Sequence, residues 1–215
     1  MPLNTQDLKE QNPKDFPNII FDYGGVILDI NVNNTVSAFQ RLLPIKIDNF
    51  QFRIESSNVF KDLERGRIDE LDFLRSINKI LNADIRWEEF EMAWNAMIGK
   101  LPVENVKLIE KVSKSHRIFL LSNTNSIHLR KVNEVVKKTI GADSIDHFFE
   151  KAYYSNNMGM RKPDTEIFNY VLREQNLNVE ETIFLDDNPL NLEGAAKVGL
   201  AVCHITNERG IREIF

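Results

Sequence analysis

The sequence predicts an α/β protein in which a parallel sheet of about five strands carries an inserted block of helices. The first observation is that short apolar segments alternate with helical segments from about residue 105 onward, which is the pattern of a parallel sheet with crossover helices. The second is that apolar residues between about residues 31 and 99 recur at helical spacing instead. A chain of 215 residues can bury a core of this kind. The expected core is therefore Rossmann-like.

The first predicted strand, Asn18 to Asp22, ends abruptly in a carboxylate. Its apolar run has the length and β-branched content of a buried parallel strand. Asp22 follows at the carboxyl tip, which is where open α/β sheets bind ligands. Gly24 and Gly25 come next and indicate a sharp bend or a close approach of the backbone. A turn-forming aspartate without a function is the alternative interpretation.

Between residues 32 and 99 we predict a helical insertion of roughly three to five helices. Its apolar residues are spaced as on one face of a helix. They are Val36, Phe39, Leu43, Leu71, Leu74, Ile77, Trp87, Phe90, Trp94 and Met97. We interpret the aromatic ones as core residues rather than cofactor contacts. Residues 17–31 and 100–215 are assigned to the α/β core, 32–99 to a helical domain and 1–16 to a polar N-terminal lead-in.

The remaining elements follow in regular alternation. Predicted helices cover about 103–113, 126–139, 164–175 and 190–198. Predicted strands cover 117–121, 151–155, 182–185 and 201–205. Since strands that alternate with helices pair in parallel, we expect their carboxyl ends at one edge of the sheet.

Composition and charge exclude several classes of protein. The net charge of −5 gives no general attraction to nucleic acid or to anionic membranes. No segment is long and apolar enough to span a bilayer, and the polar N-terminus does not resemble a signal peptide. The one cysteine, Cys203, permits no disulfide within the chain and is expected to be a small buried residue. We therefore expect a cytoplasmic protein, a monomer or a homodimer, that acts on a small molecule.

Polar residues gather where the predicted strands end. They are Asp22, the run Ser122-Asn123-Thr124-Asn125, Lys162 before a proline, and the run Asp186-Asp187-Asn188. Each piece alone could be a helix cap or an ordinary surface residue, because Asp, Asn and Ser favour helix N-termini. Their joint occurrence at four strand ends of one sheet favours a common site.

The charges at this expected site predict a metal ion and a phosphorylated ligand. Three carboxylates in one crevice repel each other unless a cation lies among them. Hard oxygen ligands with few protein anchors suit Mg²⁺, which keeps some of its waters and contacts substrate phosphate. A lysine and a hydroxyl group beside the metal suit a phosphate dianion.

These motifs, in this order, resemble those of the haloacid dehalogenase superfamily, whose members are mostly phosphatases. The resemblance covers the chain from about Asn18 to its end, and the insertion matches the helical cap of that family. The matching motifs are Asp-x-Gly-x-Val from Asp22, Glu64-Arg65-Gly66 in the insertion, Ser-Asn-Thr-Asn from Ser122, Gly-Met-Arg-Lys-Pro around Lys162, and the pair Asp186-Asp187. Within the superfamily, the motifs resemble those of the subgroup of the bacterial α-D-glucose 1-phosphate phosphatases.

The resemblance implies a role for each matching residue. The catalytic residues would be Asp22, Lys162 and Ser122; the substrate-binding residues Ser122, Asn123, Lys162 and Arg65; the metal ligands Asp22, Gly24, Asp187 and Asp186. Asp22 would attack phosphorus and form an aspartyl-phosphate. The implied reaction is Mg²⁺-dependent hydrolysis of a small phosphorylated metabolite, a sugar phosphate being one candidate.

One position departs from the family pattern. Gly24 stands where most phosphatases of the superfamily carry a second aspartate, the general acid and base, and where dehalogenases carry an aromatic residue. The retained acidic pair favours a metal, and hence a phosphatase. A metal-independent dehalogenase-type hydrolase and a catalytically weak phospholigand-binding protein remain the alternatives. Without that acid, we expect turnover to favour acidic leaving groups, such as those of sugar 1-phosphates.

Overall fold

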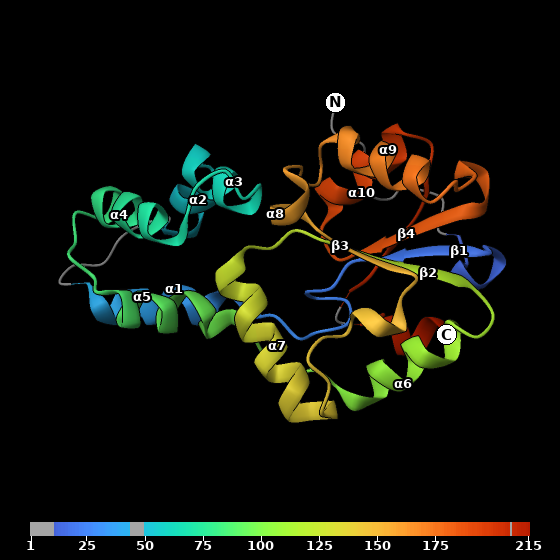
Figure 1. Ribbon diagram of the computed structural model, residues 1–215, viewed down its shortest axis with the longest axis horizontal. Helices are drawn as coiled ribbons and strands as arrows, with labels where there is room; N and C mark the ends of the chain where they lie inside the picture. Colours follow the sequence, from blue (N-terminus) through green and yellow to red (C-terminus); the bar gives the residue numbers. More distant parts are fainter. Residues whose placement is uncertain (1–10, 44–49, 207) are drawn as a thin grey trace.

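The computed structural model describes residues 11–43, 50–206 and 208–215 of the chain. Its core is a five-stranded sheet in the order β3-β2-β1-β4-β5. The strands are β1 (Asn18–Phe21), β2 (Arg117–Ser122), β3 (Lys151–Tyr154), β4 (Thr182–Asp186) and β5 (Ala201–His204). All neighbouring strands pair in parallel, so the predicted α/β fold is confirmed (Figure 1).

Helices cover both faces of the sheet (Figure 1). They are α6 (Val103–Val112), α7 (Ser126–Ile140), α8 (Ser155–Met158), α9 (Thr165–Glu174), α10 (Pro189–Lys197) and α11 (Ile211–Ile214). The four long helices that the apolar spacing predicts are confirmed. Apolar spacing does not predict the short helices α8 and α11, because about one turn of helix contains no repeat of the apolar pattern.

β1 lies at the centre of the sheet and is buried on both faces. Ile19 and Phe21 pack in one apolar cluster with residues of α6, α7 and α11, whereas Ile20 packs in another with residues of α9 and α10. A strand covered on both sides needs a continuous apolar run, which is why this segment stands out in the sequence. The buried run carries Asp22 to the carboxyl edge of the sheet.

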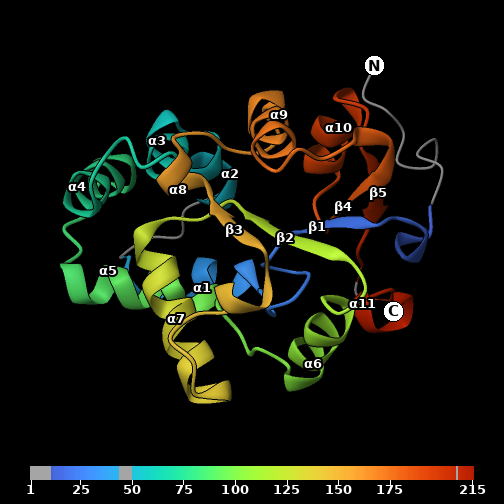
Figure 2. The same cartoon turned by 45° about the vertical axis from the view of Figure 1, so that its right-hand side comes forward.

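Between β1 and α6 the described residues 32–43 and 50–99 form a helical insertion, which we call the cap (left in Figures 1 and 2). Its helices are α1 (Val32–Leu42), α2 (Phe50–Glu55), α3 (Asn58–Glu64), α4 (Glu70–Leu81) and α5 (Trp87–Trp94). Phe39, Phe73, Phe90 and Trp94 form an aromatic cluster with ring centroids 4.9 to 6.3 Å apart. These four aromatic residues are therefore core residues of the cap, in agreement with the prediction. The assignment of residues 32–99 to a separate domain remains our proposal.

The chain leaves the core for the cap and returns to the core at one place. The N–H of Asn31 donates to the Met97 carbonyl, that of Asp29 to the Lys100 carbonyl, and that of Gly99 to the Asp29 carbonyl, each at 2.9 Å. An antiparallel bridge lies between the two segments. The outgoing and returning segments are thus bonded to each other.

Before β1 the described residues add one short element. Residues 1–10 of the predicted N-terminal lead-in lie outside the described residues, and Pro13–Asp15 form one 3-10 turn. Cys203 is buried within β5, as predicted. Among the described helices, none combines the length and the apolar character that crossing a membrane requires.

Candidate active site

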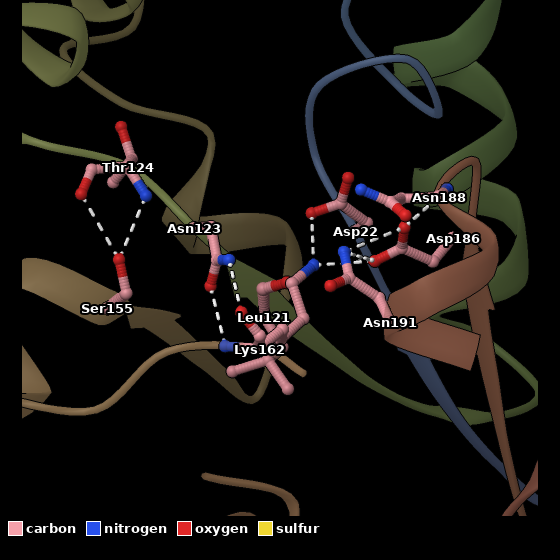
Figure 3. A network of polar contacts seen from close by, with 9 residues as sticks. All are labelled: Asp22, Leu121, Asn123, Thr124, Ser155, Lys162, Asp186, Asn188 and Asn191. Atoms are coloured by element: carbon pink, nitrogen blue, oxygen red, sulfur yellow. Dashed lines mark hydrogen bonds and ion pairs between the residues drawn. The ribbon is translucent and has the colours of Figure 1, made fainter. Parts of the chain in front are cut away.

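The carboxyl edge of the sheet brings together residues from four segments (Figure 3). Asp22 directly follows β1, Ser122 ends β2, Asp186 ends β4, and Lys162 lies on the loop between α8 and α9. One oxygen atom from each of Asp22, Asp186 and Asp187 lies within 4.8 Å of the other two. The sequence predicts this convergence, because parallel strands end on the same side of a sheet.

Lys162 is a buried cation that binds two of these carboxylates. Its side chain is 1% exposed, and Nζ donates to Asp22 Oδ1 at 2.6 Å and to Asp186 Oδ2 at 2.7 Å. A third bond, of 2.8 Å, goes to the Leu121 carbonyl, so every N–H of the ammonium group is used. Burial alone would lower the pKa of Lys162, but Asp186 and Asp22 together raise it above its ordinary value. The lysine is therefore charged, and it fixes Asp22.

The loop that carries Lys162 is held by the side chain of Asn123. Asn123 Nδ2 donates to the Lys162 carbonyl, and Asn123 Oδ1 accepts the Lys162 N–H, both at 2.9 Å. This pair of bonds engages both ends of the carboxamide. The sequence predicts Asn123 as a substrate-binding residue; with its side chain bonded to the Lys162 backbone, we favour its backbone N–H for that role.

Asp186 is more completely bonded than Asp187. Buried Asp186 accepts bonds from Lys162, from the Asn188 N–H at 2.8 Å, and from Asn191 Nδ2 at 3.1 and 3.0 Å to its two oxygens. Asp187 is exposed to the cavity described below. This difference favours Asp187 as a direct metal ligand and Asp186 as the partner that orients Lys162. Asn191 is not among the site residues predicted from the sequence; the only indication of its role there is its place in the first turn of the helix that follows Asp186-Asp187.

The charge balance at the site fits a divalent cation. Desolvation raises the pKa of Asp22 to about 7; Lys162 opposes this shift, and the Asp186 carboxylate adds to it. One lysine faces three carboxylates, so the site carries an excess of negative charge. A divalent cation would neutralise that excess, and a set of oxygen donors suits Mg²⁺.

Gly25 allows the loop after β1 to pass directly over Asp187. Its φ is +79°, and a Cβ at this position would overlap the Asp187 carboxylate. Glycine therefore keeps the carboxylate in the site. Gly24 is different, because its φ is not left-handed and a Cβ there would lie 3.0 Å from Ile30 Cγ1. A Cβ at Gly24 would thus require only that the Ile30 side chain move slightly.

Ser122 is buried at the end of β2 and lines the same cavity as Asp22. The chain that follows is supported by Ser155, whose Oγ accepts the Thr124 N–H at 2.9 Å and donates to the Thr124 carbonyl at 3.1 Å (Figure 3). This support fixes the segment that presents Ser122 and the Asn123 backbone.

A cavity of about 630 Å³, which we call the catalytic cavity, lies between the sheet edge and the cap. Its floor includes Asp22, Ser122, Lys162 and Asp187, and its wall includes Glu55, Phe60, Lys61 and Glu64 of the cap. A smaller cavity of about 130 Å³ adjoins it between the cap and residues 123–128 of the core, and we call it the cap cavity. A phosphate ester bound at the floor would extend its alcohol portion toward the cap.

Contacts between cap and core form a seam beside the catalytic cavity. Arg161 Nε lies 2.7 Å from Glu64 Oε2, and both side chains are largely buried. Gly66, in the next turn of the cap, approaches α8 so closely that a Cβ would overlap the Asn156 carbonyl. The seam therefore joins the Glu-Arg-Gly motif of the cap to the loop that leads to Lys162.

Arg65 does not face the cavity, in contrast to its predicted role in substrate binding. Its guanidinium lies 2.6 Å from the Asp164 carboxylate, and Arg65 is absent from the linings of both cavities. Glu64 and Arg161 line the catalytic cavity instead. Arg65, which caps α3, is held instead by its ion pair with Asp164, outside both linings.

Comparisons with known proteins identify a family and several similar proteins. The sequence profile of the haloacid dehalogenase-like hydrolases matches residues 19–205. A D-ribitol-5-phosphate phosphatase of Bacteroides thetaiotaomicron is 28% identical over 182 residues, covering 85% of this chain and 88% of that protein. A sesquiterpene phosphatase of Aspergillus oryzae is 25% identical over 196 residues, covering 89% and 91%. A HAD-family enzyme of B. thetaiotaomicron, crystallised with magnesium and inorganic phosphate, superposes with a TM-score of 0.78 at 26% identity, covering 89% and 94%.

Proposed function

Because this chain belongs to the haloacid dehalogenase-like hydrolases, we propose that, as a phosphatase of that family, it hydrolyses a small sugar or polyol phosphate through a phosphoaspartate on Asp22. The observation that carries the proposal is the bonding of Lys162 to both Asp22 and Asp186 beside the Asp187 carboxylate. It supplies a nucleophile, a fixed cation and a set of oxygen donors at the floor of one cavity.

Asp22 is the nucleophile in this proposal. Lys162 binds Oδ1, and Oδ2, which has no hydrogen-bond partner among the described residues, is the oxygen that we assign to the attack. The bond from Oδ2 to phosphorus forms while the bond from phosphorus to the alcohol oxygen breaks. Water then attacks the phosphoaspartate, releases inorganic phosphate and restores the carboxylate. Lys162 assists by favouring the ionised form of Asp22, which is the form that can attack.

Magnesium is the cofactor that fits the donor set. Asp22, Asp187 and the Gly24 carbonyl would hold it, with Asp186 behind them as a further ligand or through water. When bound, it supplies neutralisation of the charge on the phosphoryl oxygens and on the nucleophile.

Two further groups are assigned to the phosphoryl oxygens. They are the Ser122 hydroxyl and the Asn123 backbone N–H, both on the segment after β2. Donors that are fixed before the substrate arrives stabilise developing charge without reorganising. The cap closes the opposite side of the cavity and limits the access of bulk water.

The wall of the catalytic cavity favours a hydroxylated leaving group over a hydrocarbon one. Glu55, Lys61, Glu64 and Arg161 all line it. An apolar chain packed against these groups would remove water from them without replacing its hydrogen bonds, which costs several kcal/mol. A polyol can replace those bonds. The name of the ribitol-phosphate relative fits this chemistry better than that of the sesquiterpene phosphatase.

A metal-dependence assay tests the reaction class. The protein is incubated with p-nitrophenyl phosphate, with and without EDTA, and separately with 2-chloropropionate. We expect phosphate release that EDTA abolishes and magnesium restores, and no halide release. Metal-independent halide release would indicate a dehalogenase, and tight phosphate binding without turnover would indicate a phospholigand-binding protein.

A substrate panel tests the leaving group. We expect D-ribitol 5-phosphate and glucose phosphates to be hydrolysed faster than farnesyl phosphate; the reverse order would contradict the proposed substrate class. Glucose 1-phosphate has a more acidic leaving oxygen than glucose 6-phosphate. It should therefore be the faster of the two if no residue replaces the acid that Gly24 lacks.

A further inference from the structure

The junction between the two cavities carries, beside two glutamates of the wall, a histidine to which the mechanism above gives no task. Glu55, Glu64 and His128 each line both the catalytic cavity and the cap cavity. The two glutamates belong to the cap, whereas His128 lies in the first turn of α7, directly after the segment that carries Ser122. The junction is therefore the place where a leaving group that extends from the floor meets the cap.

His128 is held in one orientation by contacts on both sides of this junction. Its backbone N–H donates to Asn125 Oδ1 at 3.0 Å, which starts α7. Its ring stacks on Trp94 of the cap, with centroids 5.3 Å apart and planes 2° from parallel. Nδ1 lies 2.9 Å from Asn95 Oδ1. Since a carboxamide oxygen only accepts hydrogen bonds, Nδ1 carries the proton.

The second ring nitrogen of His128, Nε2, is left as an acceptor. Burial lowers the pKa of His128 to about 4, so the ring is neutral at pH 7. A neutral imidazole that is protonated at Nδ1 presents a lone pair at Nε2. Within the described part of the chain, no group donates a hydrogen bond to this atom.

We propose that His128 determines leaving-group specificity by accepting, at Nε2, a hydrogen bond from a hydroxyl group of the substrate. Glu55 and Glu64 are also acceptors, so the junction matches a ligand that brings several donors. Polyols and sugars bring such donors, whereas hydrocarbon chains do not. The assignment rests on the proposed phosphatase function and adds to it the residue that recognises the alcohol portion.

Two substitutions separate recognition from structural support. His128→Asn can retain a donor to Asn95 at the position of Nδ1 but has no group at the position of Nε2. His128→Gln can place a carboxamide oxygen near the position of Nε2. The readout is kcat/KM for a hydroxylated phosphate divided by kcat/KM for p-nitrophenyl phosphate, whose leaving group carries no hydroxyl. The hydroxylated phosphate is whichever of D-ribitol 5-phosphate and glucose 6-phosphate the wild type hydrolyses faster.

We expect His128→Asn to lower this ratio about tenfold, mainly through KM, and His128→Gln to restore most of it. An equal loss on both substrates would make His128 a structural support, and an unchanged ratio would exclude it from recognition; either result overturns the assignment. A wild type that hydrolyses p-nitrophenyl phosphate but neither hydroxylated phosphate would overturn it as well. The absence of any magnesium-dependent turnover by the wild type would instead refute the proposed function, and the assignment with it.

Discussion

The floor and the wall of the catalytic cavity are built in different ways. At the floor, every N–H of Lys162 and both ends of the Asn123 carboxamide are bonded within the protein. The wall rests on the aromatic cluster of the cap, and Glu64 and His128 each keep one polar atom without a partner among the described residues. A preorganised floor suits a reacting group common to all substrates, and an open wall suits the part that differs. Floor substitutions should therefore affect all esters equally, and wall substitutions should discriminate among them.

Asp22→Asn, at the floor, is expected to have the largest effect. The amide is nearly isosteric with the carboxylate but is a poor nucleophile, so turnover of every ester should fall by roughly 10⁴-fold or more. Phosphate release from p-nitrophenyl phosphate and from D-ribitol 5-phosphate measures the loss, and circular dichroism checks the fold. Activity in this variant, once contaminating phosphatases are excluded, would contradict the covalent mechanism.

Lys162→Met should lower kcat/KM by roughly a hundredfold or more for both esters, by analogy with the loss of a charge-stabilising donor. Asp22 and Asp186 would lose the cation that they share. Lys114→Met is a surface control, since its side chain is 71% exposed. A near-normal rate would show that Lys162 has no catalytic role. If kcat/KM fell by different factors for the two esters, the expected difference between floor and wall substitutions would be wrong.

Asp187→Ala should raise the magnesium concentration required for half-maximal activity by roughly a hundredfold, because one of few protein anchors is lost. Rates at increasing magnesium measure the shift, and saturating metal should recover much of the activity. Asp29→Ala, at an exposed aspartate on the loop after β1 and outside the acidic cluster, is the control. Identical titrations for wild type and the Asp187 variant would show that the metal ligands are assigned wrongly.

Glu64→Gln, in the wall, should lower kcat/KM for D-ribitol 5-phosphate by about fivefold and have less effect on p-nitrophenyl phosphate. The substitution removes the charge that pairs with Arg161 in a largely buried contact. Asp164→Asn disrupts the pair with Arg65, in which the carboxylate is half exposed, and should change either rate by less than about twofold. An equal loss of kcat/KM for both esters would show that Glu64 acts like a floor residue and does not discriminate between leaving groups.

The smallest effect concerns stability and the neutral state of His128. The unfolded chain, with a histidine pKa near 6.5, takes up a proton that the folded chain binds only near pH 4, so the contribution of His128 to stability falls as the pH drops through this window. Asp22, whose pKa is raised to about 7, contributes in the opposite direction, so the difference between the wild type and His128→Asn is the quantity to measure. We expect the stability of the wild type relative to this variant to fall by about 1 kcal/mol between pH 7 and pH 5, less than the full shift would give because the cavity reaches the ring. Urea unfolding of both proteins measures it, and a difference that does not change with pH would contradict burial as the cause.

The fold and the floor could be predicted because both depend on periodicity and chain order. β1 is buried on both faces, so its apolar run is uninterrupted and recognisable. Parallel pairing then forces the ends of β1, β2 and β4 to one edge, which groups Asp22, Ser122 and Asp186 without any knowledge of side-chain contacts.

The supports and the wall could not be predicted in the same way. The bonds between Asn123 and Lys162 join residues 39 positions apart, and no local pattern marks them. Whether Glu64 or Arg65 faces the cavity depends on the rotation of one helix end, which helical spacing leaves uncertain by about one residue. Side-chain direction, rather than element type, is what the sequence leaves open here.

The bonded pair of segments at Asp29 and Lys100 bears on how enzymes of this kind acquire new substrates. The two ends of the core already touch, although the whole cap lies between them in the sequence, so a cap of another length could be grafted there without separating the strands. The new cap must carry a glycine at the position of Gly66, because a Cβ there would overlap the Asn156 carbonyl. Recombination at these bonded segments would thus leave the floor of the catalytic cavity unchanged and alter which substrates the protein accepts.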